Sequence, residues 1–228
     1  DIIYSKNKIE RVNKMSSYII EGGRKLEGEV TVSGSKNASL PIIAASILNL
    51  GTTRLYNIPN IHDTQITLEI LKYLGCKVKR HNGKIEINSK KINKKEIPEH
   101  LMSQMRSTVV LAGAILGRFK EAKFSYPGGC DIGARPIDLH LKGFEALGAK
   151  VDVGQGKISA KVKKLVANSI YMDIVSVGAT INVMLASVLA EGTTTIDNAA
   201  KEPHIVDVAN FLNSMGADIR GAGRDVIK

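Results

Sequence analysis

One glycine-rich stretch, YPGGCDIGARPIDLHL at residues 126–141, carries the residue types best suited to chemistry. It places Cys130 next to Asp131 and five residues before Arg135. The glycines predict a permissive, mobile loop. A thiol here could serve as a nucleophile or a proton donor, because a nearby arginine lowers a thiol pKa, although Asp131 opposes that effect. The equally open alternative is a small buried hydrophobic residue.

Two other segments predict anion binding. In VSGSKNASLPI, Lys36 and Asn37 stand at the start of a predicted helix, where free backbone N–H groups and the helix dipole favour negative charge. Arg106 precedes a strongly apolar helix, a position that is unfavourable for a cation unless it binds an anion. Arg135 stands just before Pro136, which suits the first turn of a helix. Arg135 would be a second arginine that binds an anion at a helix start. Each cation could instead be merely solvated.

The segment DIVSVGATINVMLAS opens a further predicted helix in the same way, with Ser176, Val177 and Gly178 at its start. Glu202 precedes a proline, as Arg135 does. Capping and turn roles are the simpler interpretation of these residues. His204 has no Cys, His or Asp at metal-binding spacing, so we expect it on the surface and expect no metal site.

The elements that must position these residues form a unit that recurs three times. The phrases LGCKV, LGAKV and MGADI recur about 70 residues apart, each after an amphipathic helical pattern. Their glycines, Gly75, Gly148 and Gly216, are typical helix ends, and a short β-rich segment follows each. Upstream lie apolar helix candidates at 38–49, 102–117 and 178–190 and strand candidates at 52–58, 122–126 and 193–198. An alternating strand, GEVTVSG at 28–34, introduces the first unit. We therefore predict an α/β (α+β) domain whose helices pack inward.

Composition agrees with a folded domain and excludes several classes. Of the 228 residues 43% are hydrophobic and 4% aromatic, with no Trp, so the core is expected to be aliphatic. The longest apolar stretch, VVLAGAIL, is too short to span a membrane, and no signal peptide is evident. Two cysteines give no disulfide framework, and Cys76 is expected to be structural. These features predict a soluble cytoplasmic protein without a membrane partner.

The net charge of +10 is concentrated in residues 72–95, which hold nine Lys or Arg and one Glu. Such a run could bind nucleic acid or another acidic surface. It has a single aromatic residue and no nucleic-acid motif, so we favour a solvated face and expect no nucleic-acid partner.

Three phrases in this order, GSKNASLPI, PGGCDIGARPIDLH and SVGAT…LAEGTTTIDNAAKEP, resemble the UDP-N-acetylglucosamine 1-carboxyvinyltransferases of the EPSP synthase-like superfamily. The resemblance runs from about Met15 to Lys228. It implies βαβαββ units around buried helices with pseudo-threefold symmetry. It also implies enolpyruvyl transfer from phosphoenolpyruvate to the 3-hydroxyl of UDP-N-acetylglucosamine with release of phosphate. That reaction commits bacteria to peptidoglycan synthesis, and so to cell-wall biogenesis, cell shape and division. No metal or organic cofactor is implied.

The resemblance also assigns roles to residues. Lys36 and Asn37 match the pair that contacts phosphoenolpyruvate. Cys130 matches the proton donor, on a lid that closes over substrates, and the target of fosfomycin, a small phosphonate epoxide; Lys36 and Arg135 would share in the catalysis. The remaining substrate-binding positions are Arg106, Arg135, Pro136, Ile137, Asp138, Leu139, Ser176, Val177 and Gly178. Ile174 and His204 stand where some members have Lys and Glu, and we expect modest effects from these departures.

The same resemblance suggests a domain organisation. Residues 1–14 would be a disordered extension outside the family, residues 15–33 would lead in from a second domain, and residues 34–228 would form the transferase domain. Its repeats would span about 34–90, 98–162 and 168–228. In the family the active site lies between two similar domains, and the general-base aspartate and further arginines belong to the C-terminal one. We expect that missing domain to be the partner of this chain, and little or no turnover by the chain alone.

Two alternatives remain. One is a 3-phosphoshikimate enolpyruvyl transferase, against which Cys130 argues, since that relative needs no such cysteine. The other is a non-catalytic or basic binding module that uses residues 72–95. A salt-sensitive affinity for DNA or RNA without a response to UDP-N-acetylglucosamine would favour the latter.

Overall fold

The computed structural model describes residues 19–23, 25, 27–81, 83–128 and 137–228, which fall into two units, Asp1–Val32 and Ser33–Lys228. The described residues of the first unit form neither helix nor strand, and Val30 and Val32 are exposed. The predicted strand at 28–34 is therefore wrong. A strand requires a hydrogen-bonded partner, and none of the described strands pairs with these residues.

The first repeat of the second unit joins two helical segments to an antiparallel sheet of order β1-β3-β2, in which Thr52 lies opposite Asn88. Its elements are α1 (Lys36–Ala45), η1 (Ser46–Leu48), β1 (Thr52–Tyr56), α2 (His62–Leu74), β2 (Lys77–His81) and β3 (Lys84–Asn88). The helix predicted at 38–49 and the strand predicted at 52–58 are close to these bounds.

The second repeat has the same sheet order, β4-β6-β5. Its elements are α3 (Glu99–Met102), η2 (Arg106–Val109), α4 (Val110–Phe119), β4 (Glu121–Ser125), α5 (Asp138–Ala146), β5 (Lys150–Gly154) and β6 (Lys157–Lys161). The single helix predicted at 102–117 is wrong, because Met105 is extended (φ −157°, ψ 153°) and the helix restarts at Arg106. The Thr108 hydroxyl stabilises the break by hydrogen bonding to the carbonyl oxygens of Met102 and Met105.

The third repeat departs from this pattern. Its elements are β7 (Ser169–Tyr171), α6 (Val177–Ser187), β8 (Thr195–Asp197), α7 (Pro203–Ser214) and β9 (Val226–Ile227). Strand β7 runs parallel to β8, and β9 runs antiparallel to it. The β-rich segment expected after MGADI forms no strand. Only Arg220 and Lys228 exchange backbone hydrogen bonds there, at 2.8 and 2.9 Å.

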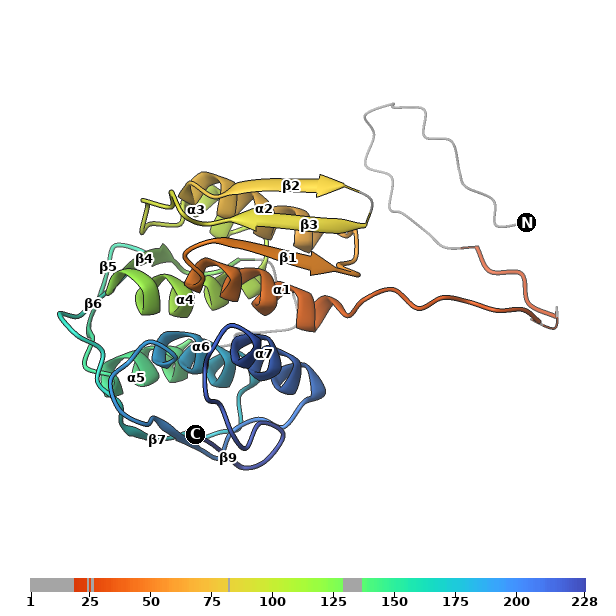
Figure 1. Cartoon of the computed structure of the whole chain (residues 1–228). Helices are drawn as coiled ribbons and strands as arrows, with labels where there is room; N and C mark the ends of the chain where they lie inside the picture. The colour runs from red at the N-terminus through yellow and green to blue at the C-terminus, as the bar shows by residue number, and fades with distance from the viewer. Residues whose placement is uncertain (1–18, 24, 26, 82, 129–136) are drawn as a thin grey trace. The chain divides into compact units, whose positions relative to one another are not determined.

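The helices of the second unit lie inside and its sheets lie outside (Figure 1). Helices α4 and α6 pack against each other, and both are buried along most of their length. Helices α2, α5 and α7 bury one face only, and each is followed by a glycine with positive φ, at 110°, 91° and 104° for Gly75, Gly148 and Gly216. The predicted fold class is therefore confirmed. No helix in the described part of the chain is both long enough and apolar enough to cross a membrane.

Candidate functional site

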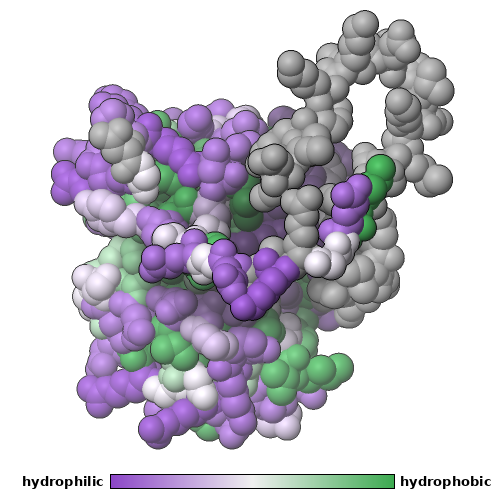
Figure 2. All heavy atoms as spheres, turned by 90° about the vertical axis from the view of Figure 1, so that its right-hand side faces the viewer, coloured by the Kyte–Doolittle hydropathy of each residue, from purple (hydrophilic) through white to green (hydrophobic). Residues whose placement is uncertain are grey.

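A pocket of about 880 Å³ lies in the second unit, where the amino ends of α1, α2, η2, α5, α6 and α7 meet. Each helix contributes a residue from its first turn or its N-cap to the lining: Lys36, Asp63, Arg106, Leu139, Ser176 and Glu202. The end of the molecule at which α1 begins is mostly hydrophilic, with hydrophobic residues in smaller groups (Figure 2). Because the amino end of a helix is the positive end of its dipole, this convergence favours an anion.

Helices α1 and α6 begin with the same local structure. The side chain of Ser35 accepts a hydrogen bond from the Ala38 N–H at 3.4 Å, and that of Ser176 accepts one from the Ala179 N–H at 3.3 Å. A serine N-cap satisfies the third N–H of a helix and leaves those of the first two residues without an intrahelical acceptor. In both helices these two residues line the pocket. The backbone thus supplies donors for the oxygens of a bound anion.

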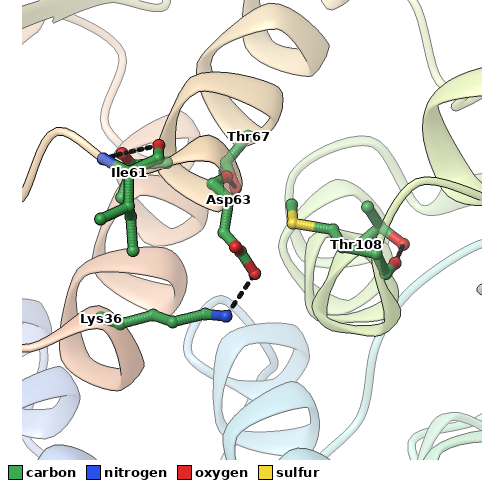
Figure 3. A network of polar contacts seen from close by, with 7 residues as sticks. Lys36, Ile61, Asp63, Thr67 and Thr108 are labelled. Atoms are coloured by element: carbon green, nitrogen blue, oxygen red, sulfur yellow. Dashed lines mark hydrogen bonds and ion pairs between the residues drawn. The ribbon is translucent and has the colours of Figure 1, made fainter. Parts of the chain in front are cut away.

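Lys36 supplies a cation at this site. Its ammonium group lies 2.5 Å from the carboxylate of Asp63, and the two side chains point toward each other from α1 and α2 (Figure 3). The Lys36 side chain remains 49% exposed, so the ion pair leaves it accessible from the pocket. Asp63 was not predicted from the sequence, although an acidic residue in a first helical turn is a recognisable capping signal.

Arg106 and His140 also line the pocket. Arg106 lies at the start of η2, where the extended Met105 ends the preceding turn. His140, on α5, is buried. Burial lowers its pKa to about 4, and the positive charge of Arg106 contributes to this shift. The imidazole is therefore neutral at physiological pH. Nothing in the sequence pattern had marked His140 as a site residue.

The predicted site residues separate into three groups. One group lines the pocket together: Lys36, Asn37, Arg106, Leu139, Ser176, Val177 and Gly178. Ile137 and Asp138 are not part of that lining, since Ile137 is buried in the core and Asp138 is exposed. Cys130, Arg135 and Pro136 lie outside the described residues.

Residues with other expected roles also line the pocket. His204, expected on the surface, is half-buried and faces the pocket from the start of α7. Ile174 lies at the pocket and is 73% exposed. One carboxylate oxygen of Glu202 is buried without a hydrogen-bond partner among the described residues. The Glu202 carboxylate thus gives the pocket lining a hydrogen-bond acceptor in addition to its donors.

Other features of the described chain do not suit anion chemistry. A second hollow, of about 390 Å³, lies at the carboxyl end of α6, the negative end of that helix dipole. Cys76 is buried, and burial raises the pKa of its thiol to about 11, against a weaker opposing effect of Arg118. That thiol stays protonated and unreactive at neutral pH. Among the described residues, no group of three or more His, Cys, Asp or Glu side chains could hold a metal ion.

Comparison with known proteins gives consistent matches. The family described as EPSP synthase (3-phosphoshikimate 1-carboxyvinyltransferase) matches residues 20–228. UDP-N-acetylglucosamine 1-carboxyvinyltransferase 2 of Clostridium acetobutylicum is 54% identical over 215 residues, which is 94% of this chain and 51% of the relative. The corresponding protein of Carboxydothermus hydrogenoformans is 51% identical over 94% of this chain and 51% of its own length. The chain thus spans about half the length of these curated relatives.

Solved structures share the fold. The enolpyruvyl transferase NikO from Streptomyces tendae superposes with a TM-score of 0.78 at 23% identity, over 90% of this chain and 48% of that one. An EPSP synthase from Acinetobacter baumannii superposes with a TM-score of 0.69 at 20% identity, over 88% of this chain and 46% of that one.

Proposed function

Because the chain belongs to the EPSP synthase family, we propose that it carries part of an active site that transfers an enolpyruvyl group from phosphoenolpyruvate to the 3-hydroxyl of UDP-N-acetylglucosamine. The observation that supports this proposal is the pocket in which Lys36, Arg106 and several helix amino ends meet. Phosphoenolpyruvate brings a phosphate and a carboxylate, and the nucleotide sugar brings a diphosphate. Both substrates therefore need the cations and N–H donors that this lining offers.

The choice of acceptor rests on the relatives. Those about 50% identical to this chain are named UDP-N-acetylglucosamine 1-carboxyvinyltransferases, which favours the nucleotide sugar over 3-phosphoshikimate. We assign Lys36 and Asn37 to phosphoenolpyruvate, and the amino end of α6, Ser176 to Gly178, to the nucleotide sugar. Arg106 and Leu139, which line the pocket, are assigned with Arg135 to holding the two substrates together. Peptidoglycan synthesis is the process that this reaction would serve.

The proposed chemistry is an addition followed by an elimination. The sugar 3-hydroxyl attacks C2 of phosphoenolpyruvate, forming a C–O bond, while C3 takes a proton and a base takes the hydroxyl proton. The C2–O bond to phosphate then breaks and C3 loses a proton, which gives the enolpyruvyl ether and inorganic phosphate. Cations and helix dipoles stabilise the charge that develops on the phosphate oxygens. We propose Cys130 as the donor of the proton to C3, Arg135 as a residue that shares in the catalysis, and fosfomycin as a reagent for that thiol.

We propose that the mechanism also uses residues from outside this pocket. A base for the 3-hydroxyl is needed, and the chain spans only about half the length of its relatives. We propose that a domain equivalent to the rest of those relatives provides the base and further arginines. Residues 34–228 would then form one domain of a two-domain enzyme, with residues 15–33 leading in from the other.

Phosphate release from phosphoenolpyruvate plus UDP-N-acetylglucosamine tests the proposal. We expect little or no release by the chain alone, and release once the other half of a close relative is added in trans. Cys130→Ala should abolish that restored release. Shikimate 3-phosphate, offered as the alternative acceptor, should give none. Release with shikimate 3-phosphate but not with UDP-N-acetylglucosamine, or a restored activity that survives Cys130→Ala, would contradict the assignment.

A further inference from the structure

The tautomer of His140 is dictated by its neighbour Asn182. The Asn182 side chain, on α6, is fully buried, and its Nδ2 lies 2.8 Å from Nδ1 of His140. Its oxygen accepts a hydrogen bond from the Gly113 N–H at 2.7 Å, and its Nδ2 also donates to the Val109 carbonyl at 3.0 Å. A backbone N–H can only donate and a carbonyl can only accept, so both ends of the amide are assigned.

This assignment leaves one arrangement for the imidazole. Because Nδ2 of Asn182 is a donor, Nδ1 of His140 must accept and carries no proton. The proton of the neutral ring is therefore on Nε2. An imidazolium would bring two N–H donors together at Nδ1 and would also face the charge of Arg106. Helix α6 carries no ionisable side chain that would offset this, so the neutral ring is the form that the surroundings favour.

The ring edge that carries Nε2 lies near the amino end of α6. A Cβ atom added at Gly178 would lie 3.1 Å from Cε1 and 3.3 Å from Nε2 of His140, so the ring lies against the first turn of α6. His140 is only 5% exposed, yet it contributes to the pocket lining. Among the described residues, none accepts a hydrogen bond from Nε2. Nε2 is not one of the described side-chain atoms that are fully buried without a partner, so it is accessible from the pocket, where a ligand oxygen can accept its hydrogen bond.

We propose that His140 is a fixed neutral N–H donor to an oxygen of a phosphate group bound at the amino end of α6, and that Asn182 is the positioning residue that fixes its tautomer. A neutral donor adds a hydrogen bond without placing a second positive charge against Arg106. The phosphate could belong to the nucleotide sugar or to phosphoenolpyruvate. The identity of the ligand rests on the proposed function, whereas the tautomer does not.

Long-range ¹H–¹⁵N NMR of the histidine-labelled chain tests the tautomer directly. We expect His140 to show the Nε2–H pattern throughout about pH 5.5–8. Asn182→Asp replaces the donor with an acceptor and should convert His140 to an Nδ1–H form. An Nδ1–H tautomer or an imidazolium in the unaltered chain at pH 7 would overturn the proposal, and that spectrum does not depend on whether the variant folds.

Binding measurements test the donor role. The chain is titrated separately with UDP-N-acetylglucosamine, phosphoenolpyruvate and inorganic phosphate, and compared with His140→Gln, which keeps an N–H donor near the Nε2 position, and His140→Leu, which does not. His140→Leu removes a hydrogen bond to a charged phosphate, so we expect its affinity for the ligand to fall roughly tenfold or more. The loss of affinity in His140→Gln should be smaller. The ligand whose affinity falls identifies the source of the phosphate.

The outcomes separate the two proposals. If the unaltered chain binds a ligand and His140→Leu binds it equally well, the donor role of His140 is wrong while the proposed function stands. If the unaltered chain binds none of the three, both the donor role and the assignment of this pocket to these substrates are wrong. Equal weakening in His140→Gln and His140→Leu would indicate a role in packing and would also contradict the donor role.

Discussion

At the scale of single residues, Lys36 and Asp63 have opposite effects on a bound anion. The carboxylate is held 2.5 Å from the ammonium group that we assign to phosphoenolpyruvate, so it offsets part of the positive charge of the pocket. An incoming phosphate must compete with Asp63 for Lys36. The two charges of this ion pair balance each other at the pocket.

Asp63→Asn should therefore tighten the binding of phosphoenolpyruvate. We expect a gain of roughly two- to fivefold, because both partners are partly exposed and such pairs are worth little in water. Isothermal titration would measure it. Asp173→Asn is the matched control, since Asp173 pairs with Lys142 at 2.6 Å and is not part of the pocket lining. Weaker binding in Asp63→Asn alone would instead mean that Asp63 holds Lys36 in its binding position.

His140 should make the stability of the fold depend on pH. Its pKa is about 4 in the folded chain against 6.5 ordinarily, so the unfolded state binds more protons between these values and stability falls as the pH falls. The expected loss between about pH 7.5 and about pH 5 is about 2 kcal/mol, measured by urea unfolding. Subtracting the pH dependence of His140→Gln isolates this contribution. Parallel pH profiles for the two proteins would contradict the low pKa.

Some of the pocket was predictable residue by residue and some was not. An arginine at a helix start conflicts with the helix dipole, and that conflict directed attention to Arg106. Lys36 was selected because a lysine beside the free N–H groups of a helix start favours an anion, and both residues line the pocket. His140 and Asn182 gave no such signal, because each acts through a contact between different helices. The asparagine within the apolar run TINVML was a usable signal, because a buried amide requires hydrogen-bond partners on a neighbouring element.

At the scale of elements, the break before η2 positions Arg106. In a continuous helix over 102–117, the backbone N–H of Arg106 would donate to the carbonyl of Met102. The extended Met105 creates a new amino end there instead. Apolar periodicity could not reveal this break, because the side chains on both sides of it are buried. The repeated phrases, by contrast, correctly predicted where α2, α5 and α7 end.

Close packing of α5 against α6 positions His140, and Gly143 makes it possible. A Cβ at Gly143 would overlap the Val183 side chain. We expect Gly143→Ala to destabilise the fold by about 1–3 kcal/mol despite the better helix propensity of alanine. Gly154→Ala is the control, because no atom lies within 4 Å of the added Cβ, and its effect should stay within about 0.5 kcal/mol. Denaturant unfolding of both variants measures the difference; equal stability would show that α5 shifts to accept the methyl group.

At the scale of the whole molecule, the excess positive charge is concentrated in the run 72–95, much of which forms β2 and β3. The pocket differs, because its lining sets Lys36 and Arg106 against Asp63 and Glu202. Strand β2 is at the edge of its sheet, and Lys77, Lys79 and Arg80 on it are exposed. Lysine on an edge strand hinders pairing with another chain, which gives this run a structural role without a nucleic-acid partner.

The alternation of helices and strands in the first two repeats and the aliphatic core followed from periodicity, whereas the meeting of helix amino ends in one pocket did not. That convergence depends on how the three repeats pack, and each repeat alone shows only one or two helix starts. The resemblance to the transferases named seven residues that line the pocket, but also Ile137 and Asp138, which do not. It did not name Asp63, Glu202 or His140, which modify the charge and the hydrogen bonding of the pocket.

Amide chemical-shift mapping with UDP-N-acetylglucosamine is the most direct test that this pocket binds the nucleotide sugar. Saturable shifts should concentrate at the first turns of α6 and η2 and on the adjoining residues of α1 and α5. Shifts centred on β2 and β3 would support a basic binding surface instead. The absence of saturable shifts from a folded sample would contradict the assignment of the pocket to this substrate.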